Sequence, residues 1–282
     1  MNILEKIASY KQKEVDERKS LYPVKLLEKS IYFETKPVSL KEYLLRNDKS
    51  GIIAEFKTRS PSKGDINTYA KAEKVSVDYM QAGASALSVL TDQHFFGGSF
   101  QNLTKARKYN YCPILQKDFI LDEYKVVEAK SIGADAILLI AAILSKAEIH
   151  HLACFAKSLN LEVLFEVHDE MEIQKVSPHI DLIGVNNRNL QTFDVDIQNS
   201  VGLADKIPAE LLKISESGIH SPDDIIKLKK TGFNGFLMGE YFMSTSDPGR
   251  ACREFIQQIK NKEQNLKQLK NERHEIESLR IK

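Results

Sequence analysis

The chain has 282 residues, and its 42% apolar and 28% charged content suits a folded protein with a sizeable core rather than a disordered chain. Forty lysines and arginines balance 39 aspartates and glutamates, so no overall field of the kind found in nucleic-acid or membrane-surface binders is expected. No run approaches the roughly 18 apolar residues of a membrane span, and the N-terminal residues lack the apolar core of a secretory signal. Composition therefore predicts a soluble protein with neither nucleic acid nor a membrane as partner.

Cysteine and histidine usage indicates neither disulfides nor a metal. Cys112, Cys154 and Cys252 are far apart and odd in number, without a CxxC spacing. The histidines, His168 among them, show no repeated metal-ligand spacing. We therefore expect a reducing, cytoplasmic setting, no metal and no cofactor.

The first 45 residues predict an N-terminal cap of two amphipathic helices. Apolar positions recur there at helical spacing among many charges, at Ile3, Ile7, Tyr10, Leu26, Leu27 and Ile31.

From Gly51 onward, short apolar runs alternate with helical segments, as in βα units. Eight strands are predicted, at 52–56, 86–90, 113–115, 136–140, 162–166, 182–185, 211–214 and 235–238. Helices are predicted between and after them, at about 69–82, 100–108, 122–130, 145–159, 169–177, 197–206, 221–230 and from 247 onward.

A weak internal repeat supports this division. Gly83, Gly133 and Gly232 each stand a few residues before an apolar strand, where a helix C-terminal cap needs a left-handed backbone. Eight βα units in roughly 200 residues favour a closed (β/α)8 barrel over an open doubly wound sheet. We expect one barrel domain over 1–262, including the cap helices of about 1–45, followed by a charged helical extension over 263–282.

That extension carries Leu266, Leu269, Ile276 and Leu279, but charged residues interrupt any steady heptad. A solvated helix is favoured over a coiled-coil partner helix. We expect a monomer, with weak self-association or a partner contact through the tail as the alternative.

Polar residues follow almost every predicted strand, at the end where reacting groups of a barrel project into one mouth. On the first strand Glu55 and Lys57 alternate with Phe56, so both charged side chains should face inward. Taken singly, each polar residue is explained as the start of a loop. The other strand ends carry Lys117, Glu166, Asn186, Arg188, Glu216, Ser217, Gly218, Gly239 and Glu240.

Glycines follow the last two strands, in SESG (215–218) and LMGEYF (237–242). Backbone N–H groups often bind phosphate at this place in barrels. Neither segment is specific alone, because glycine after a strand is commonly a turn. Together they predict a phosphorylated small-molecule substrate.

These blocks resemble the indole-3-glycerol phosphate synthase family. The resemblance rests on IIAEFKTRSPSKGDI (52–66), PILQKDF, LFEVH, IGVNNRNL, SESGI and GFLMGEYFM, in the family's order, and extends to about residue 260. Phe56, Thr58, Gln116 and the charged tail depart from the family pattern, but no reacting group is lost. The resemblance implies a (β/α)8 barrel and a carboxy-lyase of tryptophan biosynthesis.

The resemblance also implies roles for the strand-end residues. Lys117 would be the general acid of ring closure, and Glu166 would exchange protons during dehydration. Lys57 would hold the substrate carboxylate and could act as a second acid, and Glu55 would orient the lysines. The remaining assignments are Asn186 and Arg188 for hydroxyl and carboxylate groups, Ser60, Ser217, Gly218, Gly239 and Glu240 for the phosphate, and Phe96, Phe119, Leu138 and Leu190 for the aromatic ring, where core packing is the alternative.

Two other functions remain open at this point. A different phosphate-binding barrel, either an isomerase or an aldolase with Lys117 as Schiff-base nucleophile, has the same kind of site. A catalytically silent barrel that binds a phosphorylated metabolite, or a scaffold that recruits a partner through its tail, is the alternative from another class.

Overall fold

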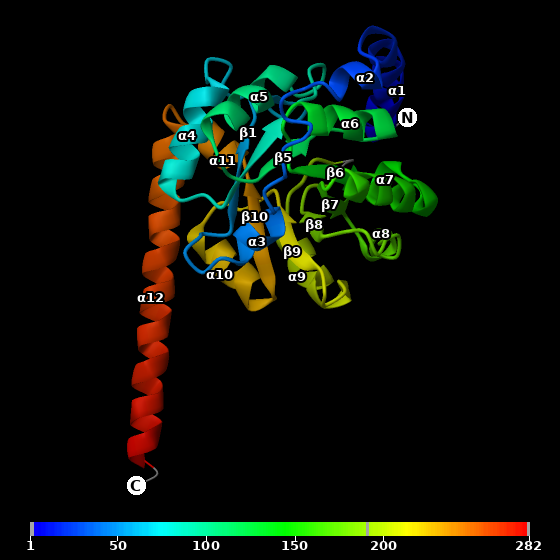
Figure 1. The fold of residues 1–282 in the computed structure, drawn as a ribbon. Helices are drawn as coiled ribbons and strands as arrows, with labels where there is room; N and C mark the ends of the chain where they lie inside the picture. Colours follow the sequence, from blue (N-terminus) through cyan, green and yellow to red (C-terminus); the bar gives the residue numbers. More distant parts are fainter. Residues whose placement is uncertain (1–2, 190–191, 281–282) are drawn as a thin grey trace.

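The computed structural model describes residues 3–189 and 192–280, with side chains for 6–189, 192–269, 271 and 272. Within them, parallel strands close into a barrel in the order β1-β10-β9-β8-β7-β6-β5-β4 (Figure 1). The predicted (β/α)8 fold is confirmed. The barrel strands are β1 (Ile52–Phe56), β4 (Ala86–Leu90), β5 (Ile114–Lys117), β6 (Ala136–Ile140), β7 (Glu162–Val167), β8 (Leu182–Asn186), β9 (Leu212–Glu216) and β10 (Phe233–Met238).

Helices surround the barrel and bury the outward faces of its strands. They are α4 (Ala72–Ala82), α5 (Phe100–Tyr109), α6 (Glu123–Ser131), α7 (Lys146–Ser158), α8 (Glu170–Ile173), α9 (Gln198–Leu203), α10 (Pro222–Lys230), α11 (Glu240–Met243) and α12 (Pro248–Arg280), with short 3-10 turns η1 (Ala141–Ile143) and η2 (Ala204–Lys206). Gly83, Gly133 and Gly232 have the positive φ angles expected of helix ends.

The alternation along β1 separates two cores. Phe56 packs outward into the core between barrel and helices, whereas Ile53 packs into the barrel interior. Glu55 has the inward parity of Ile53, as predicted. Glu55 therefore points into the barrel, whereas the apolar residues of the strand pack into both cores.

Several predicted boundaries were wrong. β5 extends to Lys117, beyond the apolar residues that marked it. α8 ends at Ile173 rather than at about residue 177. The segment of α9 and η2 ends at Lys206, as predicted, because the residue that precedes Pro208 disfavours the helical backbone.

The N-terminal region forms three helices, not two: α1 (Ile3–Leu21), α2 (Val24–Leu27) and α3 (Leu40–Leu45). Ile7 of α1 and Leu40 and Leu44 of α3 are buried in the interior core, while Leu26 and Ile31 are exposed. α1 reaches the carboxyl-terminal end of the strands, where Ile7 joins Phe119 in the interior core, and α3 contacts β4 and β10 at the other end (Figure 1). The cap thus contributes to both ends of the barrel.

The tail continues the last barrel helix without a break. Ile256 and Ile259 of α12 are buried, whereas Leu266 and Leu269 are exposed. Figure 1 shows the C-terminal part of α12 extending well beyond the barrel. No helix of the described residues is both long and apolar enough to cross a bilayer.

Candidate active site

A cavity of about 580 Å³ opens at the carboxyl-terminal end of the barrel strands. Every predicted site residue that the structure describes lines it, and Leu190 lies outside the described residues. Sequence segments more than 180 residues apart therefore meet around one space. The predicted residues brought together are Glu55, Lys57, Ser60, Phe96, Lys117, Phe119, Leu138, Glu166, Asn186, Arg188, Ser217, Gly218, Gly239 and Glu240.

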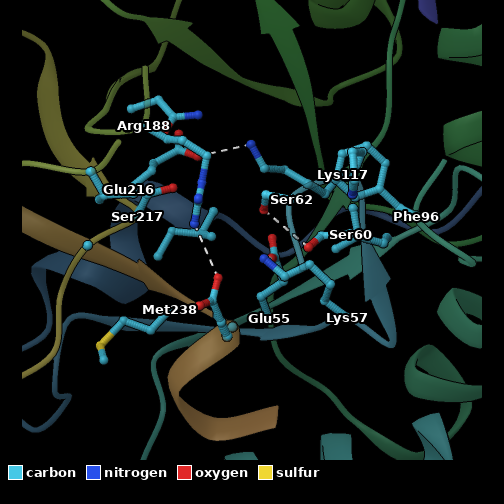
Figure 2. A pocket seen from close by; sticks show the side chains of 18 of the residues that line it. Glu55, Lys57, Ser60, Ser62, Phe96, Lys117, Arg188, Glu216, Ser217 and Met238 are labelled. Atoms are coloured by element: carbon cyan, nitrogen blue, oxygen red, sulfur yellow. Dashed lines mark hydrogen bonds and ion pairs between the residues drawn. The ribbon is translucent and has the colours of Figure 1, made fainter. Parts of the chain in front are cut away.

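One wall of the cavity carries Glu55 and Lys57. The Lys57 ammonium lies 3.0 Å from Glu55 Oε1, and Ser88 of the neighbouring strand donates a hydrogen bond to Glu55 Oε2 at 3.2 Å. Glu55 is almost fully buried. Its carboxylate therefore fixes the lysine at the mouth of the barrel (Figure 2).

The centre of the site is the Lys117 ammonium, which contacts two carboxylates. Its Nζ lies 2.5 Å from Glu166 Oε2 and 2.9 Å from Glu216 Oε2. Asn186 donates a further hydrogen bond to Glu166 Oε1 at 3.1 Å. The side chains of Lys117 and Glu216 point into the same space in Figure 2.

Burial and charge shift the proton affinities of this group in different directions. Burial alone lowers the pKa of Lys117, but Glu166, Glu216 and Glu55 outweigh it and raise that pKa above its ordinary value. Burial alone raises the pKa of Glu166, but Lys117 and His168 lower it to about 2. Burial, with Glu166 and Glu55 nearby, raises the pKa of Glu216 to about 7. The site therefore holds one carboxylate that stays ionised and one that titrates near neutrality.

Two glycines make room for the buried carboxylates. A Cβ at Gly184 would lie 2.1 Å from Glu216 Oε1, and a Cβ at Gly239 would lie 2.7 Å from Glu55 Oε1. Any larger residue would displace these side chains. Gly239 therefore makes room for Glu55, a role separate from its predicted contact with the phosphate.

The turn after β9 has an unusual backbone. Ser217 and Gly218 have φ angles of 66° and 73°, and such a conformation is uncommon for a residue with a side chain. A Cβ at Gly218 would come within 2.3 Å of Val195. Strained backbone of this kind is concentrated at functional sites, where surrounding contacts maintain it.

The side chain of Glu240 forms ion pairs with two cations. Arg188 lies 3.2 Å from Glu240 Oε2, and Lys63 lies 3.5 Å from Glu240 Oε1. Arg188 also donates to the Phe193 carbonyl at 3.2 Å. Two cations therefore offset this acidic group beside the predicted phosphate position.

The apolar wall lies opposite these charges along the barrel rim. The rings of Phe96 and Phe119 are 6.0 Å apart between centroids, and Leu138 and Ile7 complete the surface. Phe119 and Leu138 also belong to the interior core, which is the alternative role predicted for them. Such a wall suits a flat aromatic group.

The loop after β1 is a small hairpin over the cavity. Its strands β2 (Arg59–Ser60) and β3 (Gly64–Asp65) pair antiparallel, and the Ser60 hydroxyl lies 3.4 Å from that of Ser62. The Thr58 hydroxyl donates to the Gly97 carbonyl at 3.2 Å, which links the hairpin to the next loop.

Sequence reasoning assigned no role to several site residues. Glu216 was recognised only as a strand end, although its place in SESG, directly before the glycine turn, was the available signal. Lys63 carried a weaker signal, as a cation in the loop after β1. His168 was set aside for lack of metal spacing, yet it lies 3.6 Å from Glu166. Ile7 could not be placed at the cavity by local pattern.

A closed parallel barrel with paired lysines and glutamates at the carboxyl ends of its strands defines an enzyme of the TIM-barrel class that performs acid–base chemistry. The profile described as "Indole-3-glycerol phosphate synthase" matches residues 4–255. The chain belongs to the indole-3-glycerol phosphate synthase family.

Individual relatives agree with this assignment. The chain is 46% identical to an indole-3-glycerol phosphate synthase of Bacteroides thetaiotaomicron, over 92% of this chain and 99% of the relative. It is 42% identical to one from Campylobacter fetus, over 86% of this chain and 94% of the relative. The family resemblance found in the sequence is confirmed.

Solved structures support the fold alone. The chain is similar to 3-hexulose-6-phosphate synthase from Salmonella typhimurium, with a TM-score of 0.58 and 13% identity over 74% of this chain and 98% of that one. It is also similar to a chain of the tryptophan synthase complex from Pyrococcus furiosus, with a TM-score of 0.55 and 12% identity over 76% and 99% of the two chains.

Proposed function

We propose that the cavity is where this chain carries out the reaction of its family. That reaction converts 1-(2-carboxyphenylamino)-1-deoxyribulose 5-phosphate into indole-3-glycerol phosphate, with loss of carbon dioxide and water, in tryptophan biosynthesis. The observation that carries the proposal is the Lys117 ammonium, held between Glu166 and Glu216 and facing the cavity.

Ring closure needs an acid at the ketone. As the ring carbon that bears the carboxylate attacks the ketone, negative charge grows on the carbonyl oxygen, and the Lys117 ammonium donates a proton to it. A new carbon–carbon bond forms and the oxygen becomes a hydroxyl group. Carbon dioxide then leaves, and its bonding electrons restore the aromatic ring.

Dehydration needs a base and an acid together. Glu166, which is ionised and held by Lys117 and Asn186, takes a proton from carbon. Either Lys57 or reprotonated Lys117 protonates the departing hydroxyl, which leaves as water. Both lysines line the cavity, so both assignments of this second acid stand.

The two ends of the substrate have matching surroundings. Lys57, Asn186 and Arg188 bind its carboxylate and hydroxyl groups, and the wall of Phe96, Phe119 and Leu138 packs against its ring. Ser60 and the backbone N–H groups of Ser217, Gly218, Gly239 and Glu240 bind the phosphate. The β2–β3 hairpin closes over the bound substrate, which orders the ring against the ketone.

The proposal requires one chain only, because the described barrel residues supply all of these groups. We place the domain boundary at about residue 262 and expect the tail to be dispensable for turnover. The free thiols Cys112, Cys154 and Cys252 support a reducing, cytoplasmic setting. A purified chain that ends at residue 262 tests both expectations, because it should be monomeric and should keep its activity.

The decisive experiment follows indole fluorescence after the enzyme is mixed with the substrate. The chain contains no tryptophan, so the protein contributes little background. Wild type is expected to generate the signal, and Glu166→Gln is expected to lose it while keeping its fold. Absence of signal from wild type, together with borohydride trapping of a substrate adduct on Lys117, would establish the aldolase alternative instead.

A further inference from the structure

The loop after β7 places an imidazole against Glu166 on the side away from the cavity. His168 Nε2 lies 3.6 Å from Glu166 Oε1. This nitrogen is buried and has no hydrogen-bond partner within the described part of the chain. His168 does not line the cavity, so its ring faces a bound substrate through Glu166, which does.

The opposite edge of the ring is fixed by α8. Glu172 Oε2 lies 3.2 Å from His168 Nδ1 and 2.6 Å from the backbone nitrogen of His168. Asn199 donates to the His168 carbonyl at 3.0 Å and to the Asn186 carbonyl at 3.3 Å. The ring and the backbone on which it stands are therefore both held in place.

These contacts determine the protonation of the ring. An ionised Glu172 only accepts hydrogen bonds, so Nδ1 carries a proton. In a neutral ring Nε2 would then present its lone pair to the Glu166 carboxylate, which is unfavourable. A proton on Nε2 converts this contact into an attraction between an imidazolium and a carboxylate.

We propose that His168 is a positioning residue of the reaction: its imidazolium, fixed by Glu172, keeps Glu166 ionised and directed into the cavity. This inference rests on the proposed role of Glu166 as proton acceptor. It adds a three-residue chain, Glu172 to His168 to Glu166, of which Glu172 and His168 lie behind the cavity wall.

The charges around Glu166 explain how the imidazolium contributes to the reaction. The groups that face Glu166 are Lys117 from β5, Asn186 from β8 and His168, with Glu216 and Glu55 beyond Lys117. When Lys117 gives its proton to the ketone, Glu166 loses its nearest cation. Its affinity for a proton would then rise before the dehydration step in which it acts. An imidazolium on the other side remains in place through that step. Burial alone lowers the pKa of His168, but Glu172 and Glu166 raise it above its ordinary value.

The test compares wild type with His168→Gln across a range of pH. Glutamine retains an amide that can donate toward Glu166 but carries no charge. We expect the ratio of wild-type to variant kcat to be about tenfold while His168 is protonated and to fall toward one as pH rises through its pKa, with KM little changed. A ratio that does not depend on pH would reduce His168 to a structural role and overturn the proposal.

A second measurement is independent of turnover. Nitrogen NMR of labelled histidine side chains, with His168 assigned by its loss in His168→Gln, should show both ring nitrogens protonated at pH 6.5. Glu172→Gln should lower that pKa and reproduce the kinetic effect, whereas the exposed His151→Gln should change neither. A neutral His168 at pH 6.5 would refute the proposal. Failure of wild type to close the ring would instead refute the proposed function, and the NMR result would still decide the state of His168.

Discussion

Lys117 and Glu216 meet across the barrel: the lysine Nζ of β5 lies 2.9 Å from Oε2 of the glutamate on β9, which stands opposite in the strand order. The two residues are 99 positions apart in the chain. Glu166 of β7 approaches the same ammonium at 2.5 Å. An acid placed between two carboxylates stays protonated until a substrate oxygen with growing negative charge competes for its proton.

Replacement of that acid should remove turnover without removing the fold. Lys117→Met keeps most of the side-chain volume but has no proton to donate, so kcat should fall by about 10²- to 10⁴-fold with a smaller change in KM. Steady-state kinetics and circular dichroism check this. Lys74→Met on the exposed face of α4 is the matched control. A rate within a few fold of wild type would exclude Lys117 as the acid.

Glu216 should make stability depend on pH. Its pKa is raised from 4.5 to about 7, so the folded state binds more protons than the unfolded state between these values. Stability should therefore fall as pH rises from about 4.5 to about 7, and this group alone accounts for about 3 kcal/mol of the fall. Glu216→Gln should remove that part of the dependence.

Urea unfolding at pH 5 and pH 8 measures the effect. From pH 5 to pH 8, the free energy of unfolding of Glu216→Gln should increase relative to that of wild type. Glu170→Gln, an exposed residue, should track wild type at both. Parallel curves for Glu216→Gln and wild type would mean that the carboxyl group titrates normally in the folded protein.

Gly184 should control the position of Glu216. A methyl group there would occupy the space of Glu216 Oε1, so Gly184→Ala should push the carboxyl group away from Lys117 and lower kcat by about tenfold to a hundredfold. Gly202 on α9 has open space around it, and Gly202→Ala should leave kcat unchanged and stabilise the helix by up to about 1 kcal/mol. Equal kinetics for both variants would contradict the steric role of Gly184.

A buried ion network should hold α1 to the barrel. Lys11 is almost fully buried and lies 2.9 Å from Asp92 Oδ2 and 3.1 Å from Asp118 Oδ1. Lys11→Met would leave these carboxylates without that cation, and should cost about 3 to 5 kcal/mol of unfolding free energy.

Urea unfolding of Lys11→Met and Lys13→Met makes the comparison, because Lys13 lies exposed on the same helix. Lys13→Met should stay within about 0.5 kcal/mol of wild type. Since α1 also carries Ile7 to the cavity, KM should rise in Lys11→Met alone. A loss below 1 kcal/mol would show that the network contributes little.

The strands, the helices between them and the polar strand ends could all be predicted from the chain, because their patterns are local. A period of two along IIAEF places Glu55 and Phe56 on opposite faces wherever the strand lies, and glycine before a strand marks a helix end by its backbone freedom. The parallel arrangement then directs every strand end to one mouth. The predicted strand-end residues line the cavity for this reason, whereas Lys63 and Ile7, which also line it, were not predicted to do so.

Contacts across the barrel were decided only by the tertiary structure. The pairing of Lys117 with Glu216, the space left by Gly184 and the approach of His168 to Glu166 depend on how eight strands close and which side chains then compete for one volume. The cap helices show the same limit: spacing predicted helices, but burial of Lys11 depends on carboxylates that the chain delivers some 80 and 107 residues later. Local periodicity sets the direction of a side chain, whereas its partner and its charge state follow from packing.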